Sequence, residues 1–179
     1  ATALMRRGAQ EAAHALVAVA LEELQKLRND IAQAMDFIAS LPASVRDEVA
    51  YQFFASFFDH YLPRLLLRHY VWGGGKTLTL TKQQMIDCNP YITVLRSEAF
   101  QQAVGAAAKK PGGPPQPLEI RVPAAALTNG TLGQFGVHMK GLLRVTAKDQ
   151  CTFSGHMDFF DTWDFDPKDF STGGRSLHG

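Results

Sequence analysis

The sequence predicts an α+β protein in which a helical front half is followed by an antiparallel β-sheet. Up to about residue 109, apolar residues recur every three or four positions, the spacing of one helical face. From residue 118 they recur at every second position, which is typical of strands. We expect a helical region at 1–72 and, at 73–179, short helices followed by the sheet, as separate regions or one continuous domain.

Composition limits the possible functions. The chain has 179 residues, 46% hydrophobic and 20% charged, which is ordinary for a soluble globular protein with one or two cores. A net charge of +1, with no basic stripe between aromatics, argues against a nucleic-acid partner. The apolar stretch at 12–21 is too short to span a bilayer. Two cysteines allow at most one disulfide and argue against structural zinc. From the abrupt ends we expect the chain to be a fragment of a longer protein.

The first expected helix runs from about Gln10 to Ser40 and ends at Leu41-Pro42, because a proline disfavours helix at the preceding residue. Charged and amide residues between positions 22 and 30 form its solvated side. Its apolar face consists of Val17, Ala20, Leu24, Leu27, Ile31, Ala34, Met35 and Ile38.

A second helix is expected to start at Ser44, since Ser44-Val-Arg-Asp47 resembles a capping box. Its aromatic residues cover more than one face, which predicts burial between other elements. Pro63 is expected to kink or end this helix, with a further helical piece at 64–70.

Gly73–Gly75 predicts a turn, because a phosphate-binding loop needs a different spacing. The alternating residues of 76–81 predict a strand. Thr81-Lys-Gln-Gln84 is a capping box for a short helix ending near Asp87 or Cys88, and Ser97 is expected to begin another helix that ends near Lys109.

A strand is expected over 118–122, and Asn129-Gly130 is a tight-turn dipeptide. Two longer strands follow, over about 135–145 and 151–159, joined by a short polar turn. One face of this hairpin is apolar. The other carries His138, Lys140, Arg144, Ser154, His156 and Asp158. This face is either an ordinary solvent-exposed surface or part of a functional site.

An acidic–aromatic run follows the last strand. Asp158, Asp161, Asp164, Asp166 and Asp169 alternate with Phe159, Phe160, Trp163, Phe165 and Phe170. Carboxylates this close repel one another, and aromatic surroundings raise the cost of ionising them. Such a cluster indicates a bound cation, a basic partner or acid–base chemistry.

Several interpretations of this run stay open. An EF-hand is excluded, because its glycine and closing glutamate are absent. A looser site for Mg²⁺, or alternatively Ca²⁺, fits the carboxylate density, with Asp158, Asp164 and Asp166 as ligands. Alternatively, Phe159, Trp163 and Phe165 are core anchors and the aspartates cap turns and face water.

Arg175 follows a glycine-rich turn, and His178 lies close behind it. Arginine binds phosphate oxygens through two parallel hydrogen bonds. Together with a carboxylate and a histidine it would form a phosphoester-cleaving set, whereas a salt bridge to a nearby aspartate is the simpler interpretation.

Asp161-Thr-Trp-Asp164 followed by Arg175 resembles the activity domain of colicin M-like bacteriocins, with their Asp-x-Tyr-Asp element and His-Arg pair. The resemblance implies helices beside a curved, half-barrel-like antiparallel sheet. It also implies a toxin, delivered to the periplasm of a target bacterium, that cleaves the lipid-linked peptidoglycan precursor lipid II with a divalent metal. Peripheral membrane contact and an immunity protein as partner would follow. The toxin modules of bacterial secretion systems are also similar.

Carried over, Asp161 and Asp164 match the two motif aspartates and Arg175 matches the arginine. Trp163 replaces the family tyrosine, and Gly174 stands where the histidine would be. The proton-transferring residue is therefore expected to be His156, with His138 or His178 as alternatives. The competing hypothesis is a non-enzymatic binding domain that docks a basic partner on the acidic–aromatic run.

Overall fold

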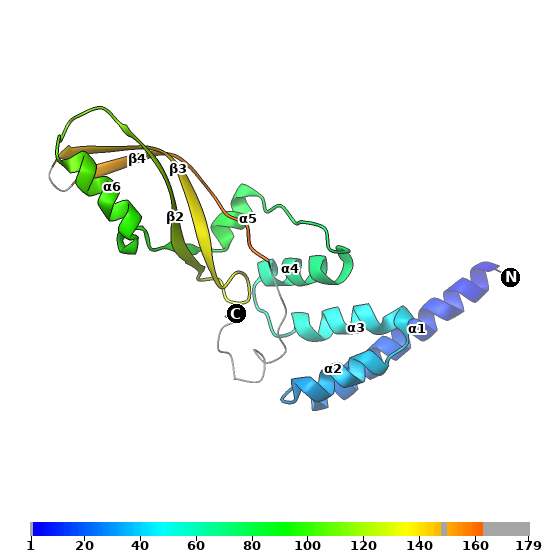
Figure 1. The fold of residues 1–179 in the computed structure, drawn as a ribbon. Helices are drawn as coiled ribbons and strands as arrows, with labels where there is room; N and C mark the ends of the chain where they lie inside the picture. Colours follow the sequence, from blue (N-terminus) through cyan, green and yellow to red (C-terminus); the bar gives the residue numbers. More distant parts are fainter. Residues whose placement is uncertain (1, 148–149, 163–179) are drawn as a thin grey trace. The chain divides into compact units, whose positions relative to one another are not determined.

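The computed structural model describes residues 2–147 and 150–162 of the chain (Figure 1). These residues form two compact units. The helical unit comprises residues 2–87 and 129–131, and the sheet unit comprises residues 88–128 and 132–162. The expected α+β class is confirmed.

Five helices make up the helical unit: α1 (Thr2–Lys26), α2 (Ile31–Ser40), α3 (Ala43–Ala55), α4 (Tyr61–Trp72) and α5 (Lys82–Asp87). Its core lies among the first four, where Leu24, Val49 and Leu62 are fully buried. None of the described helices combines the length and apolar character that crossing a membrane requires.

The expected single helix over 10–40 is wrong, because the chain breaks between α1 and α2. The Asp30 carboxylate accepts a hydrogen bond from the Gln33 amide at 3.0 Å and so caps a new helix. Leu24, Ile31 and Ala34 are all buried, so the apolar spacing continues across the break. Spacing alone therefore hid the helix boundary.

The expectations for the next two helices also need correction. No side chain caps α3, which begins directly after Pro42, and Ser44 lies inside it. Pro63 belongs to the first turn of α4 and does not end a helix. The amides of a first turn have no partner within the helix, so a proline there removes no hydrogen bond.

The segment between α4 and α5 was only partly predicted. Gly74 and Gly75 have positive φ angles of 61° and 75°, which confirms the turn. Residues 76–81 were expected as a strand but pair with no other strand of the described chain. The capping box is confirmed, since the Gln84 amide donates to Thr81 Oγ1 at 3.2 Å and the Thr81 amide to Gln84 Oε1 at 2.9 Å.

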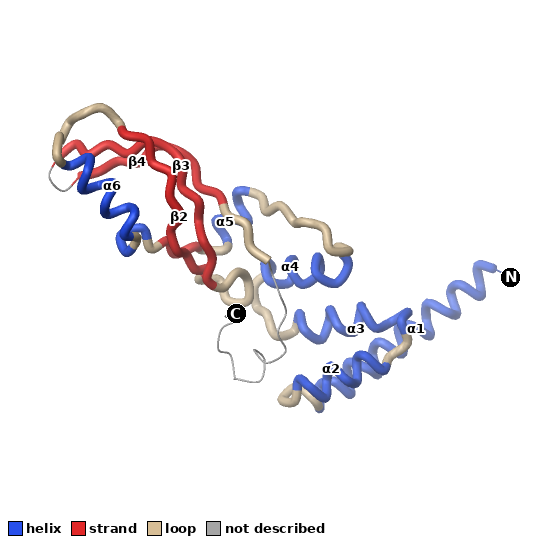
Figure 2. Tube along the Cα trace, in the orientation of Figure 1, coloured by secondary structure: helices blue, strands red, loops and turns tan. Residues whose placement is uncertain are grey.

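The sheet unit contains β1 (Pro90–Ile92), β2 (Gln116–Ala126), β3 (Gln134–Ala147) and β4 (Gln150–Asp158). The strands are antiparallel in the order β1-β2-β3-β4 and curl into a half-barrel (Figure 2). A short 3₁₀ turn (Val94–Arg96) and α6 (Glu98–Ala108) precede β2. As expected, Ser97 caps α6, accepting from the Phe100 amide at 3.3 Å. The short β1 was not expected.

The two faces of the sheet differ as the alternation predicted. On the apolar face, Leu118 of β2 and Leu143 of β3 pack with Phe100 of α6. On β4 this face is poorly covered, because Met157 is 46% exposed and Cys151 is also exposed. The strand lies at the edge of the sheet, so only its inner half is protected. Cys151 and the buried Cys88 are both free thiols.

Candidate functional site

The register of the strands gathers six polar side chains on the exposed face of the sheet. Neighbouring side chains in a row across antiparallel strands lie about 5 Å apart, and successive rows about 7 Å apart. One row runs across β2, β3 and β4 through Arg121, His138 and Asp158, and the next through Glu119, Lys140 and His156. We call these six residues the polar face.

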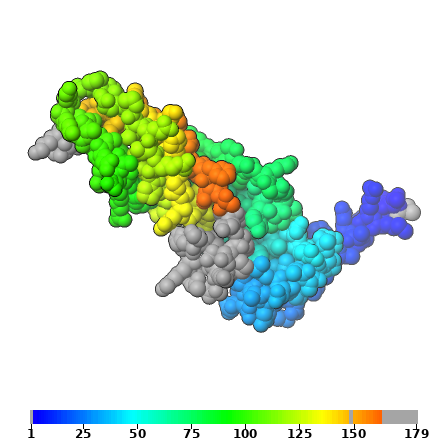
Figure 3. Space-filling view, viewed as in Figure 1, coloured from blue at the N-terminus to red at the C-terminus, as the bar shows by residue number. Residues whose placement is uncertain are grey.

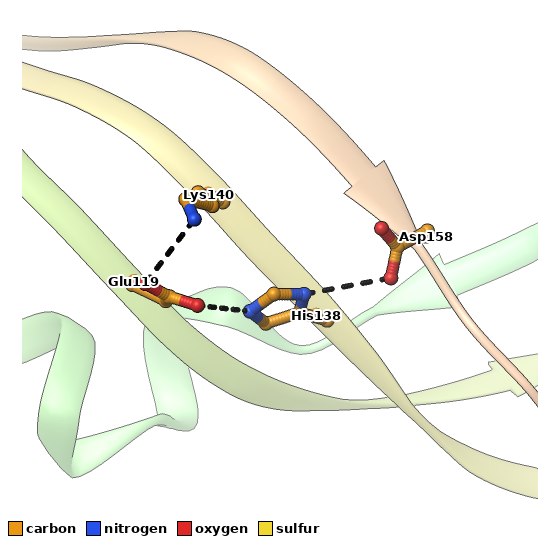
Figure 4. Close-up of polar contacts among 4 residues, drawn as sticks. All are labelled: Glu119, His138, Lys140 and Asp158. Atoms are coloured by element: carbon orange, nitrogen blue, oxygen red, sulfur yellow. Dashed lines mark hydrogen bonds and ion pairs between the residues drawn. The ribbon is translucent and has the colours of Figure 1, made fainter.

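His138 is held at the centre of the polar face by a carboxylate on each side (Figure 4). Its Nε2 lies 3.0 Å from Glu119 Oε1, and its Nδ1 lies 3.5 Å from Asp158 Oδ1. The side chain of His138 is 27% exposed, whereas the two carboxylates are 58% and 63% exposed. Lys140 Nζ lies 3.7 Å from the other oxygen of Glu119.

The two contacts of His138 are unequal, and this determines what the ring can do. A separation of 3.0 Å is a good hydrogen bond, whereas 3.5 Å is too long for one. Glu119 therefore orients the imidazole through Nε2, and Nδ1 is the nitrogen that can exchange a proton with another molecule.

There is open space beside His138 on the same face. Gly136 precedes it by two residues on β3, and a Cβ atom added there would meet no atom within 4 Å. Arg121, directly opposite His138, is exposed and forms no ion pair with a described residue. A phosphate-bearing molecule could thus approach the imidazole over Gly136 with an arginine within reach.

The structure describes only some of the residues that the sequence predicted as a site. His156 lies on the polar face, opposite Lys140, and makes no hydrogen bond or ion pair with a described residue. Asp158 is beside His138, and Asp161 is exposed shortly after β4. Asp164, Asp166 and Arg175, with Trp163, Phe165, Asp169, Phe170 and His178, lie outside the described residues.

The structure therefore describes only part of the predicted metal site. Of its three expected ligands the structure describes Asp158, whose carboxylate faces an imidazole nitrogen. Within residues 2–147 and 150–162, no three histidine, cysteine or acidic side chains gather as metal ligands do. A hard cation such as Mg²⁺ prefers oxygen ligands, and Asp158 supplies one carboxylate. The metal site stays a prediction.

Glu119 is the residue that the sequence did not connect with the site. The alternation over 118–122 places it on the polar face of its strand. Its contact with His138, however, spans 19 residues and depends on the register of β2 against β3. The connection runs from Ala126 to Gln134, which is longer than the two-residue turns that set the register of a tight hairpin.

The acidic–aromatic run begins at the end of β4. Of its aromatic side chains that the structure describes, one is packed and the other is exposed. The ring of Phe159 packs on Phe135 with 4.7 Å between centroids, as a core anchor would. Phe160, by contrast, is 77% exposed. In the space-filling view the orange stretch that follows β4 lies at the surface (Figure 3).

Comparisons with protein-family models, with curated proteins and with solved structures found no match to this chain.

Proposed function

We propose that this chain is an antibacterial toxin domain that hydrolyses a phosphoester bond of lipid II, the undecaprenyl-linked peptidoglycan precursor. The observation that supports this proposal is His138, held between Glu119 and Asp158 on an exposed sheet face. The substrate class rests on the resemblance of Asp161, Asp164 and Arg175 to the colicin M-like motif.

In the proposed hydrolysis, a water oxygen forms a bond to phosphorus while the bond to the leaving oxygen breaks. The water loses a proton to a base and the leaving oxygen gains one from an acid. His138 exchanges its proton at Nδ1, while Glu119 holds Nε2 and so fixes the orientation of the ring. Arg121, across from His138, stabilises negative charge on the phosphate.

The residues carried over from the motif complete the proposed site. Asp161 and Asp164 act at the reacting phosphate, and Arg175 clamps its oxygens. His156 serves as a second proton donor beside Lys140. Asp158, Asp164 and Asp166 would hold Mg²⁺, with Ca²⁺ as the alternative. A bound divalent ion supplies positive charge that neutralises the phosphate oxygens.

The same proposal covers location and partners. The protein is secreted, or delivered to the periplasm of a target bacterium, where its lipid-linked substrate lies at a membrane surface. Contact with the membrane is then peripheral. A producing cell would need protection, so an immunity protein is the proposed protein partner.

The direct test is to incubate the purified full chain with lipid II, with and without Mg²⁺, and to identify the products by mass spectrometry. We expect Mg²⁺-dependent release of the phosphorylated headgroup. His138→Ala should slow this release by about 10²–10⁴-fold, whereas the matched His14→Ala, on exposed α1, should leave it unchanged. Intact lipid II after incubation with the wild-type chain would refute the function. Undiminished cleavage by His138→Ala would refute only the role of His138.

A second candidate is a non-enzymatic binding domain, and the exposure of Phe160 beside Asp158 and Asp161 favours it. An aromatic ring flanked by carboxylates suits a basic protein surface. This function predicts association that weakens with salt and with Phe160→Ala but does not respond to chelators. Lipid II would then remain uncleaved.

A further inference from the structure

The outer edge of β4 is open in the described part of the chain. β4 is the last strand of the sheet, and no described strand pairs with its outer side. Eight of its nine residues are exposed, and only Phe153 is half-buried. An open edge presents unpaired backbone N–H and C=O groups, which are a template for another strand.

Among the described residues, nothing gives this edge the usual protection against pairing. Natural edge strands are short, or carry lysine or proline, or are covered. β4 is nine residues long and contains no lysine, arginine or proline, whereas β1 at the opposite edge has only three residues. Met157 and Cys151 also leave apolar surface exposed on the α6 side of the sheet.

We infer that β4 pairs with β4 of a second copy of this chain, antiparallel and centred on Ser154. In that register Ser154 lies opposite itself. The remaining pairs are Gln150 with Asp158, Cys151 with Met157, Thr152 with His156, and Phe153 with Gly155. The two-fold axis passes through a residue and not between two residues. Each side chain therefore lies opposite a side chain on the same face of the joined sheet.

The register avoids like-charge pairs and brings the exposed apolar groups of the strand together. Asp158 meets the neutral Gln150, so no like charges lie opposite one another, which would be destabilising. Met157 meets Cys151, which covers the two exposed apolar groups of the strand. A shift by two residues in either direction leaves part of β4 unpaired, whereas centring on Ser154 pairs all nine residues.

Pairing would also extend the polar face. Thr152 of the second copy comes to lie beside His156, and its Gln150 beside Asp158. The outer row of the polar face is then lined by hydroxyl and amide groups from the other molecule. This inference concerns only the strand edge and holds whether or not the chain cleaves lipid II.

The test is analytical ultracentrifugation of the full chain under reducing conditions over a range of concentrations. We expect a reversible dimer. Ser154→Lys and Ser154→Glu should each be monomeric, because they place like charges opposite one another at the two-fold axis, and an equimolar mixture of the two should dimerise. Ser44→Lys on the exposed side of α3 is the matched control and should dimerise like the wild type. Circular dichroism checks that each variant is folded.

Cross-linking tests the register itself. In a Cys151→Ser background, Ser154→Cys should form a disulfide-linked dimer on mild oxidation. Thr152→Cys should not, because its own counterpart lies four residues away along the strand, about 13 Å. A wild-type chain that is monomeric at every concentration, or a dimer that Ser154→Lys leaves unchanged, would overturn the inference.

Discussion

Gly141 on β3 and Gly155 on β4 lie directly opposite one another, and a Cβ atom added to either would lie 2.6 Å from the Cα of the other. The same atoms would lie 2.3 Å from the carbonyl oxygens of Ser154 and Lys140, respectively. Only glycine allows the strands to approach this closely. The pair adjoins the row of Lys140 and His156. It therefore sets how closely β4, which carries His156, lies against β3.

Gly141→Ala should therefore destabilise the protein. The added methyl group meets backbone atoms, which cannot move aside as a flexible side chain can, and overpacking costs about 1–3 kcal/mol. Gly136→Ala on the same strand is the control, since its Cβ meets open space. Urea unfolding compares the free energies of unfolding. Equal values for the two variants would show that the strands separate without cost.

Glu119 and His138 should act as one unit in the proposed hydrolysis. General acid–base catalysis contributes about 10²–10⁴-fold to a rate, so His138→Ala should lower turnover by that order. Glu119→Gln should lower kcat by a smaller factor, because it loosens the imidazole without removing it, while Glu22→Gln on α1 should have no effect. In the double variant the losses should not multiply. Fully multiplicative losses in lipid II cleavage would show that the two residues act independently.

Filling the space beside His138 should impair substrate binding. Gly136→Leu places a side chain over the open part of the polar face, and Gly136 has no positive φ that would strain the backbone. We expect an increased KM for lipid II with an unchanged unfolding midpoint, and a much weaker effect for Gly136→Ala. Unchanged kinetics with Gly136→Leu would place the substrate elsewhere.

Asp164→Ala and Arg175→Ala should each abolish lipid II cleavage while the protein keeps its fold. The first removes a predicted Mg²⁺ ligand and the second the predicted phosphate clamp. Adding excess Mg²⁺ should restore part of the activity to Asp164→Ala but none to Arg175→Ala. Activity in both single variants would remove the basis of the colicin M-like interpretation.

The stability of the helical unit should depend on pH through Asp87. The Tyr61 hydroxyl and then the Gln83 amide donate to its carboxylate and hold the pKa of Asp87 below its ordinary value of 3.8. A lowered folded-state pKa adds stability above that ordinary value, and this is lost as the pH falls through the folded pKa. Tyr61→Phe should therefore lower the unfolding midpoint near neutral pH, and the difference from wild type should shrink in strong acid. A difference that stays constant with pH would argue against this linkage.

The sequence by itself determined the features that depend on neighbouring residues. The reciprocal bonds of Thr81 and Gln84 and the cap at Ser97 involve groups only three residues apart, so the residue types specify them. The period-two alternation likewise assigned His138, His156 and Asp158 to one face of the hairpin, because successive side chains on a strand point to opposite faces.

Tertiary structure decided the features that depend on contacts between residues far apart in the sequence. Residues 76–81 alternate like a strand but pair with no strand among the described residues, and Asp30 starts a new helix inside an unbroken apolar repeat. The contact of Glu119 with His138 likewise depends on how β2 aligns with β3. A shift of one residue would turn Glu119 to the other face of the sheet. That alignment comes from packing the apolar face against α6, and no short stretch of sequence encodes it.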